Sequence, residues 1–184
     1  PTLDTDALAG LAAALKRAGV REVRGRFLTW GGAIPFTRVV DSGQPEHVGY
    51  NPSLSGLNLN FNRVHFEWRR AGSDYSVTMD ARTELYRPQV RMSQVRIVSR
   101  DVPVYTYERG GELDSWTVAR GALGDGGSRW LPVRRPALYA GDVFRSLAEA
   151  EGLRLPAPVE VTEAPEGEEI ARHESATLRA ILRD

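Results

Sequence analysis

The segment Leu57–Asn62 constrains the fold most strongly, because apolar residues and asparagines alternate along it. A period of two is typical of a half-buried strand, which we predict over Leu57–Trp68. From Val64 onward the apolar residues take the opposite phase, and such a change requires a bulge or tight turn, predicted at Asn62–Arg63. Asparagine disfavours strands unless its amide has a partner. The asparagine face therefore either bonds to a neighbouring loop or lies in water.

Other periodic segments predict the remaining helices and strands. A leucine stripe with Asp4 or Thr5 as N-cap predicts a helix through about Ala18, and a second helix is expected over Leu138–Glu151. A third is expected to start at Ser175 as N-cap, with Leu178, Ile181 and Leu182 facing inward. The further strands expected are Val23–Trp30, Tyr75–Asp80, Val90–Val98, Val102–Glu108, Leu113–Ala119 and Val159–Thr162.

Glycine and proline mark the connections between these elements. Residues 31–52 form a long excursion, a candidate functional segment, and Gly124–Ser128 is predicted to be a flexible loop. The fold class expected is α+β, with a body of helices on a small sheet built from both chain ends and a β-rich inserted domain. We assign residues 1–60 and 130–184 to an α+β accessory domain and residues 61–129 to the inserted domain.

Composition narrows the function classes. The 24 basic and 24 acidic residues cancel, which counts against a dedicated nucleic-acid binder. Cysteine is absent, so disulfides and thiolate metal sites are excluded. No apolar run approaches the roughly 20 residues needed to span a bilayer. The N-terminal residues lack the basic and apolar regions of a signal peptide and a starting methionine, so we expect a processed chain or part of a longer one.

The residues with catalytic potential form no recognisable constellation. The histidines, which have no metal-type spacing, are His47, His65 and His173. A Gly-x-Ser-x-Gly elbow is absent, and the acidic run at 163–169 lacks the alternating oxygen ligands of a calcium loop. We therefore expect no catalytic residue, metal or cofactor in this chain. Asp41 and Glu46 in the excursion could bind a cationic group, although exposed loop carboxylates usually do not.

Several stretches, taken in order, carry a family resemblance. They are Pro1–Leu3, Gly19–Gly25, Asn51–Trp68, Ser93–Arg96, Tyr139–Val143, His173–Leu178 and Ile181–Asp184. In this order they resemble segments of the low-molecular-mass class C penicillin-binding proteins. That family comprises periplasmic or extracellular D-alanyl-D-alanine carboxypeptidases and endopeptidases.

The family's chemistry implies three motifs, Ser-x-x-Lys, Ser-x-Asn and Lys-Thr-Gly, and none of them occurs here. The only lysine, Lys16, has Ala13 three residues before it, and no serine has an asparagine two positions on. The resemblance implies that the first motif lies upstream and the second downstream of this chain. We therefore expect the accessory insertion of a serine-type carboxypeptidase, inactive on its own.

The resemblance also implies a partner and a location. The peptidoglycan stem peptide would be bound through the parent enzyme, in the periplasm or outside the cell. Asp41 is the candidate contact to a diamino-acid side chain of that peptide. The alternative is a stand-alone cell-envelope module that binds wall peptides or a protein partner; an unrelated enzyme is disfavoured by the missing constellations. The oligomeric state stays open.

Overall fold

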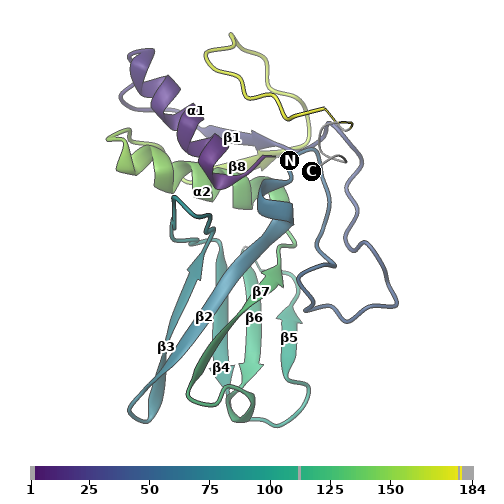
Figure 1. The fold of residues 1–184 in the computed structure, drawn as a ribbon. Helices are drawn as coiled ribbons and strands as arrows, with labels where there is room; N and C mark the ends of the chain where they lie inside the picture. Colours follow the sequence, from purple (N-terminus) through teal and green to yellow (C-terminus); the bar gives the residue numbers. More distant parts are fainter. Residues whose placement is uncertain (1–2, 112, 178, 180–184) are drawn as a thin grey trace.

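The computed structural model describes residues 3–111, 113–177 and 179. Two helices and a pair of strands lie above two three-stranded sheets (Figure 1), so the α+β class is confirmed. The elements are α1 (Thr5–Arg17), β1 (Phe27–Trp30), η1 (Leu59–Asn62), β2 (Arg63–Ala71), β3 (Asp74–Asp80), β4 (Ser93–Val98), β5 (Tyr105–Glu108), β6 (Asp114–Ala119), η2 (Arg120–Ala122), β7 (Gly126–Pro132), α2 (Pro136–Ala150) and β8 (Pro158–Val161).

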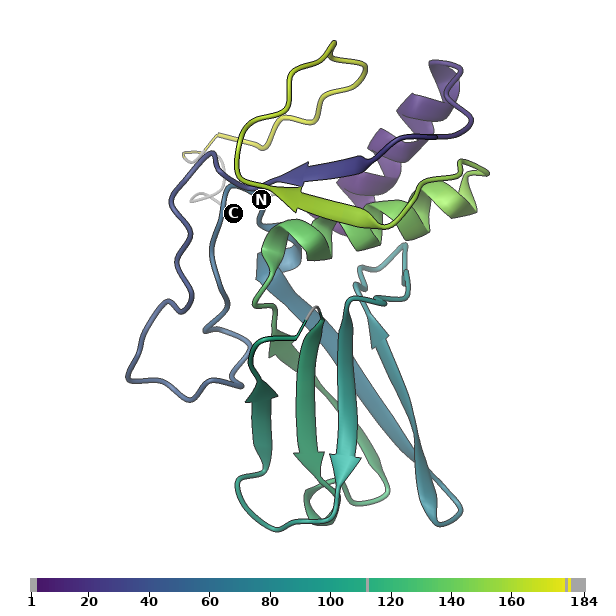
Figure 2. The same cartoon turned by 180° about the vertical axis from the view of Figure 1, so that it is seen from behind.

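The upper part is built from both ends of the chain, as predicted. β1 pairs in parallel with β8, so that Leu28 lies opposite Val159. α2 contacts α1 and both strands (Figure 2). Gly141 permits this close approach, because a Cβ atom there would lie 2.6 Å from side-chain carbons of both Pro158 and Thr29.

The lower part holds two sheets that lie one behind the other in Figures 1 and 2. One is antiparallel with the order β3-β2-β7; in the other, β6 pairs in parallel with β4 and antiparallel with β5. Phe66 of β2, Leu131 of β7 and Trp116 of β6 are fully buried in one hydrophobic cluster, which also contains Leu8 of α1 and Tyr139 of α2. The sheets and the helices therefore share a single core.

The predicted caps of α1 are confirmed, whereas α2 begins two residues before the predicted Leu138 and ends one residue before Glu151. Asp4 is the N-cap of α1, and its Oδ1 accepts a hydrogen bond from the N–H of Ala7 at 2.8 Å. Gly19, just beyond the end of α1, has a φ of 90°, which only glycine adopts without strain. Pro136 opens α2 at a position where its missing N–H costs no hydrogen bond.

The strand predicted over Leu57–Trp68 is wrong in its first half. β2 begins only at Arg63, and η1 precedes it. Asn60, Phe61 and Asn62 have φ values of 50°, 59° and 49°, in the left-handed region. Asparagine tolerates that region better than other side chains do, and this turn propensity outweighs the alternating pattern. The turn predicted at Asn62–Arg63 therefore lies over Leu59–Asn62, so it includes Asn62 but not Arg63.

The loop predicted over Gly124–Ser128 is also partly wrong, because Gly126 already belongs to β7. Trp68 lies opposite Gly127 in the β2–β7 ladder, and a Cβ atom at Gly127 would be 2.7 Å from the Trp68 ring. Glycine here makes room for a cross-strand indole, so it does not interrupt the strand.

Three strands start three or four residues later than predicted, at Phe27, Ser93 and Tyr105, and β6 starts one residue later, at Asp114. For β4 the reason is visible, because the N–H groups of Arg91 and Met92 donate to a side chain of α2. The C-terminal helix predicted from Ser175 falls largely outside the described residues, and the chain is irregular through residue 177. None of the helices in the described ranges is long and apolar enough to cross a membrane.

Candidate functional site

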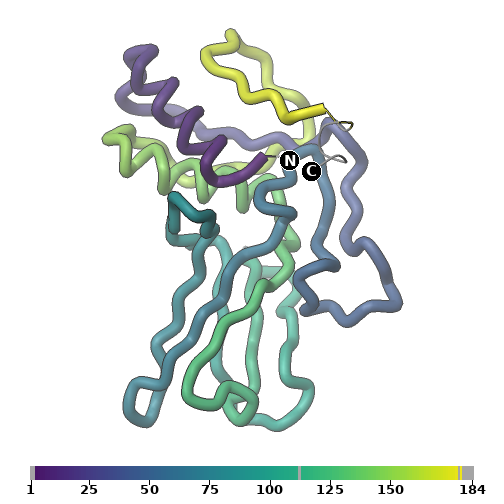
Figure 3. Tube along the Cα trace, in the orientation of Figure 1, coloured from purple at the N-terminus to yellow at the C-terminus, as the bar shows by residue number. Residues whose placement is uncertain are grey.

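The excursion predicted over residues 31–52 extends to residue 58 in the structure and projects beside the two sheets (Figure 3). Its ends are tied together, because the N–H of Gly56 donates to the carbonyl of Gly31 at 2.7 Å. Thr37 and Leu54 exchange backbone hydrogen bonds of 3.0 and 2.8 Å further out. Compact surface loops with closely spaced ends are frequently functional.

The asparagines of η1 fix the point where the excursion rejoins the body. Asn60 donates from Nδ2 to Thr5 Oγ1 at 2.8 Å and accepts the N–H of Thr5 at 3.2 Å. Fully buried Asn62 accepts the N–H of Leu59 at 3.1 Å and donates to the carbonyl of Ser53 at 2.8 Å. Of the two alternatives left open by the sequence, bonding to neighbouring segments is therefore correct for these two residues.

Phe61 sits between these two asparagines and points outward. Its side chain is 58% exposed although its φ of 59° lies in the left-handed region. For a residue with a Cβ atom that conformation costs about 1–2 kcal/mol. The guanidinium of Arg63 lies 5.2 Å from the centroid of the Phe61 ring. Because the strained backbone of Phe61 presents an aromatic ring to solvent, we consider a functional role for this residue.

A cavity of about 420 Å³ lies between the excursion and η1. Tyr50 and Val40 on its rim are 68% and 56% exposed, in addition to Phe61. Among the residues that the structure describes, the lining consists of Val40, Gly49, Tyr50, Pro52, Leu54, Asn58, Phe61 and Arg63. Arg63 is the only charged member of this lining, so the cavity suits the apolar part of a small ligand.

Arg134 holds the excursion against the body. Its side chain lies just before α2 and is only 4% exposed. Nη1 donates to the carbonyls of Arg38 and Asn51 at 2.9 and 2.8 Å, and Nη2 donates to the carbonyl of Glu46. Burial lowers the pKa of Arg134, because the charged form loses hydration. Three excursion carbonyls replace part of that hydration.

Asp41, the predicted contact residue, lies at an exposed turn of the excursion. Its Oδ1 accepts the N–H of Gly43 at 2.8 Å, an Asx-type turn. Asn51 fixes the backbone of Asp41 by accepting its N–H at 3.0 Å and donating to its carbonyl at 2.9 Å. The structure therefore sets the position of Asp41 while leaving its carboxylate accessible.

Two further titratable residues in the middle of the excursion contact Tyr105 of β5 and Arg109, which follows it. Glu46 accepts hydrogen bonds from Arg38 and Arg109, which outweigh the opposing effect of burial and lower the pKa of Glu46. His47 stacks on Tyr105 with ring centroids 5.1 Å apart, and burial lowers the pKa of His47. Across the described residues, His, Asp and Glu side chains form no group of three suited to a metal ion.

The sequence predicted that Asp41 lies on a functional segment, but it did not predict the residues that hold this segment in place. Arg134 and Arg135 are adjacent, and nothing in the sequence distinguishes the buried one. Asn51 belongs to one of the segments that resemble the penicillin-binding family. Its hydrogen bonds to Asp41 could not be predicted, because they depend on the conformation of a loop that has no periodic sequence pattern.

The fold is similar to that of penicillin-binding protein 4 (dacB) from Haemophilus influenzae. That structure matches with a TM-score of 0.62 and 14% sequence identity, over 94% of this chain and 40% of the other. A second structure of the same protein, complexed with a novel β-lactam, matches with a TM-score of 0.54 and 13% identity, over 94% and 37% of the two chains. This chain thus spans about 40% of the length of that protein. No curated protein sequence matches it.

The family comparison agrees with the resemblance noted in the sequence. At such low identities the structural likeness concerns the fold alone, so membership rests on the sequence of the chain itself. The model of the D-Ala-D-Ala carboxypeptidase 3 family, S13, matches residues 1–184, which is the whole chain. The chain therefore belongs to the D-Ala-D-Ala carboxypeptidase 3 (S13) family.

Proposed function

We propose that this chain is a non-catalytic accessory region of a serine-type D-Ala-D-Ala carboxypeptidase/endopeptidase that acts on peptidoglycan in the cell envelope. The supporting observation is a family match over residues 1–184 in a sequence without Ser-x-x-Lys, Ser-x-Asn or Lys-Thr-Gly. An acyl-enzyme requires an activated nucleophile. In this proposal the nucleophile belongs to another part of the same polypeptide, and residues 61–129 form an inserted domain within the accessory one.

The excursion is the part that we assign to substrate binding. It is held in one shape by Arg134 and by the tied ends at Gly31 and Gly56. Preorganised loops lose less entropy when a ligand binds. The exposed rings of Phe61 and Tyr50 beside an apolar cavity would form one wall of a groove for the stem peptide.

Asp41 would contact the cationic end of a diamino-acid side chain in that peptide. One carboxylate oxygen is engaged by the N–H of Gly43. The second oxygen has no hydrogen-bond partner within the described part of the chain and can accept from an ammonium group. Because Asn51 holds the backbone of Asp41, the carboxylate needs no loop rearrangement to do so.

Labelling with a fluorescent penicillin tests the accessory role. The purified chain of 184 residues should carry no covalent label, whereas a polypeptide that adds the segments with Ser-x-x-Lys, Ser-x-Asn and Lys-Thr-Gly in frame should be acylated. Covalent labelling of the chain alone would contradict the proposal. Tight binding of wall peptides by the isolated chain, without any acylating segment in its reading frame, would favour a stand-alone binding module instead.

The role of Asp41 is tested in the acylating polypeptide with Asp41→Asn. We expect kcat/KM to fall about tenfold for peptides with a diaminopimelate side chain and to stay within about twofold for peptides with alanine there, since a charge-assisted bond contributes roughly 1.5 kcal/mol. Asp125→Asn is the matched control, because Asp125 is 98% exposed at the far tip of the sheets. Equal kinetics of Asp41→Asn and wild type would contradict the proposed contact of Asp41 with the substrate. The proposed accessory role of the chain would be unaffected.

A further inference from the structure

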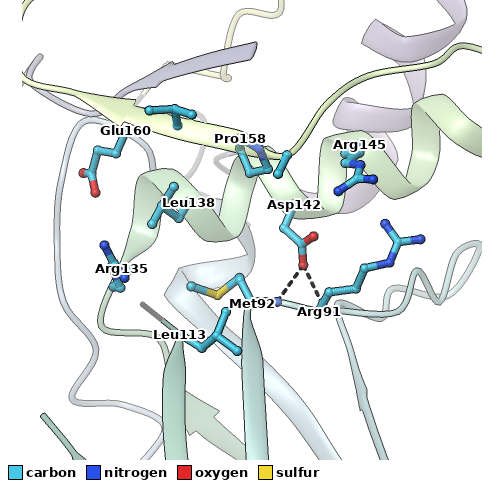
Figure 4. Close-up of a pocket in the computed structure, with 11 residues that line it drawn as sticks. Arg91, Met92, Leu113, Arg135, Leu138, Asp142, Arg145, Pro158 and Glu160 are labelled. Atoms are coloured by element: carbon cyan, nitrogen blue, oxygen red, sulfur yellow. Dashed lines mark hydrogen bonds between the residues drawn. The ribbon is translucent and has the colours of Figure 1, made fainter. Parts of the chain in front are cut away.

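A second cavity lies below α2, away from the excursion cavity. It has a volume of about 560 Å³ and is bounded by α2, β8 and the segment that leads into β4 (Figure 4). Met92, Leu113, Leu138 and Pro158 give it an apolar surface. Cavities of this size with an apolar lining and a few charged groups are typical of small-ligand sites.

One end of the cavity carries two arginines that share a single carboxylate. Arg91 Nη2 lies 2.8 Å from Glu149 Oε2, and Arg145 Nε lies 3.0 Å from Glu149 Oε1. The hydrogen bond from Arg91 lowers the pKa of Glu149, so this carboxylate is ionised at neutral pH. Each guanidinium has five N–H donors, and Glu149 engages one nitrogen of each. Donors of both arginines are thus left over for an anion.

The wall beside these arginines is fixed by Asp142, which is 3% exposed. Its Oδ2 accepts the N–H of Arg91 at 2.6 Å and the N–H of Met92 at 3.0 Å, as drawn in Figure 4. Ser146 adds a hydrogen bond of 3.1 Å to the carbonyl of Gln89. Residues 89–92 are therefore tied to α2 by these three hydrogen bonds in addition to the bond from Arg91 to Glu149. A cavity held in this way is preorganised for a ligand.

The opposite end of the cavity limits what can enter. Glu160 of β8 lies there, together with Arg135 (Figure 4). The carboxylate of Glu160 and the guanidinium of Arg135 offset each other, so this end offers no net positive charge to a second anionic group on a ligand. Multiply charged anions are therefore disfavoured, while a ligand with one carboxylate and an apolar body satisfies both ends.

We propose that this cavity binds a short peptide with a free terminal carboxylate. The carboxylate lies on Arg91 and Arg145, and a small apolar side chain packs on Met92 and Leu138. Guanidinium groups match the geometry of carboxylates, and Leu138 lies one turn before Asp142 on the same face of α2. The proposal goes beyond the function assigned to the excursion and does not rest on it.

The chain offers a direct probe, because it has two methionines and only Met92 lines the cavity. Met79 is buried in β3 and serves as the internal control. In methyl-labelled methionine NMR, N-acetyl-alanyl-alanine should shift the Met92 signal saturably and leave Met79 unchanged. The C-terminal amide of the same peptide should bind at least about tenfold more weakly, since it lacks the charge-assisted bonds.

Arg145→Gln should weaken peptide binding by about tenfold, with an unchanged Met79 signal showing that the fold is intact. Arg154→Gln is the matched control, because Arg154 and Arg24 share Glu22 as Arg91 and Arg145 share Glu149. It should bind the peptide like wild type. An unmoved Met92 signal, equal binding of acid and amide, equal losses in both variants, or an equally strong response to inorganic phosphate would each overturn the proposal.

Discussion

The Nη1 atom of Arg134 lies 2.8 Å from the carbonyl oxygen of Asn51. This contact joins Arg134, the second residue before α2, to the returning arm of the excursion, and the same guanidinium reaches the outgoing arm at Arg38. Within the described residues, every hydrogen bond that it makes goes to a backbone carbonyl. A buried cation held by peptide dipoles is costly to disturb, because its removal leaves several carbonyls without donors.

Arg134→Gln should therefore destabilise the chain by about 2–4 kcal/mol. Glutamine is shorter and cannot reach three carbonyls at once. Urea unfolding gives the change in the free energy of unfolding. Hydrogen exchange gives its location, and we expect the amides of Asp41 and Asn51 to lose protection before those of the sheets do.

Arg109→Gln provides the comparison for Arg134→Gln. Arg109 also binds the excursion, through Glu46 at 3.0 Å, but its side chain is 71% exposed. Exposed ion pairs contribute about 0–1 kcal/mol. If Arg109→Gln lowers the free energy of unfolding as much as Arg134→Gln does, the excursion is held mainly by exposed ion pairs.

The sequence predicted the elements whose signals are local. Asp4 and the leucine spacing identify α1, and Pro136 and Gly152 delimit α2, because caps and helical periodicity act over a few residues. The strand prediction at Leu57–Asn62 was wrong because alternation of apolar residues and asparagines is compatible with both a strand and a turn. The left-handed propensity of asparagine favours the turn, and the hydrogen bond from Asn60 to Thr5, which is distant in sequence, stabilises it further.

The candidate site was predictable only in outline. Glycine and proline content located the excursion and hence Asp41, since those residues mark irregular backbone. The burial of Arg134 and the cavity between Arg145 and Glu160 arise where separate segments meet. Such contacts depend on tertiary packing, and a single sequence carries no periodic trace of them.

His65 should make stability depend on pH between about 7.5 and 5.5, around the ordinary histidine pKa near 6.5. It is 7% exposed, its Nδ1 has no hydrogen-bond partner within the described residues, and its ring packs edge-on against Trp130. Burial and the charge of Arg82 lower the pKa of His65, against the opposing effects of Asp80 and other neighbours. The unfolded chain then binds the proton more readily, so stability falls as the pH falls.

The test is urea unfolding of wild type and His65→Gln at both pH values. The variant should lose less stability on acidification than wild type does. His47 has a pKa lowered by burial and contributes in the same direction, so a part of the loss remains. His173→Gln, an exposed control, should keep the wild-type dependence. If His65→Gln also keeps the wild-type dependence of stability on pH, protonation of His65 is not its cause.

Asn62→Ala should destabilise the chain by about 2–4 kcal/mol. Asn62 is fully buried, has a φ of 49° and bonds both Leu59 and Ser53, so alanine loses the bonds and suits the backbone less well. Phe61→Asn is the matched change at the neighbouring left-handed position, and because Phe61 is exposed we expect an effect within about 1 kcal/mol. Thermal unfolding shows which of the two variants is less stable. A larger loss of stability for Phe61→Asn than for Asn62→Ala would contradict the role of η1 as a buried asparagine turn.

Gly141→Ala should destabilise the chain by about 1–3 kcal/mol, although alanine favours helices, because its Cβ atom would meet Pro158 and Thr29 at 2.6 Å. β8 must then move away from α2, and the cavity of Met92 would change shape with it. Gly10→Ala in α1 is the control, since nothing lies within 4 Å of a Cβ atom there and helix propensity should stabilise by about 0.5–1 kcal/mol. Unfolding in urea should therefore give opposite signs for the two substitutions. The same sign for both would mean that α2 and β8 are not in tight contact at Gly141.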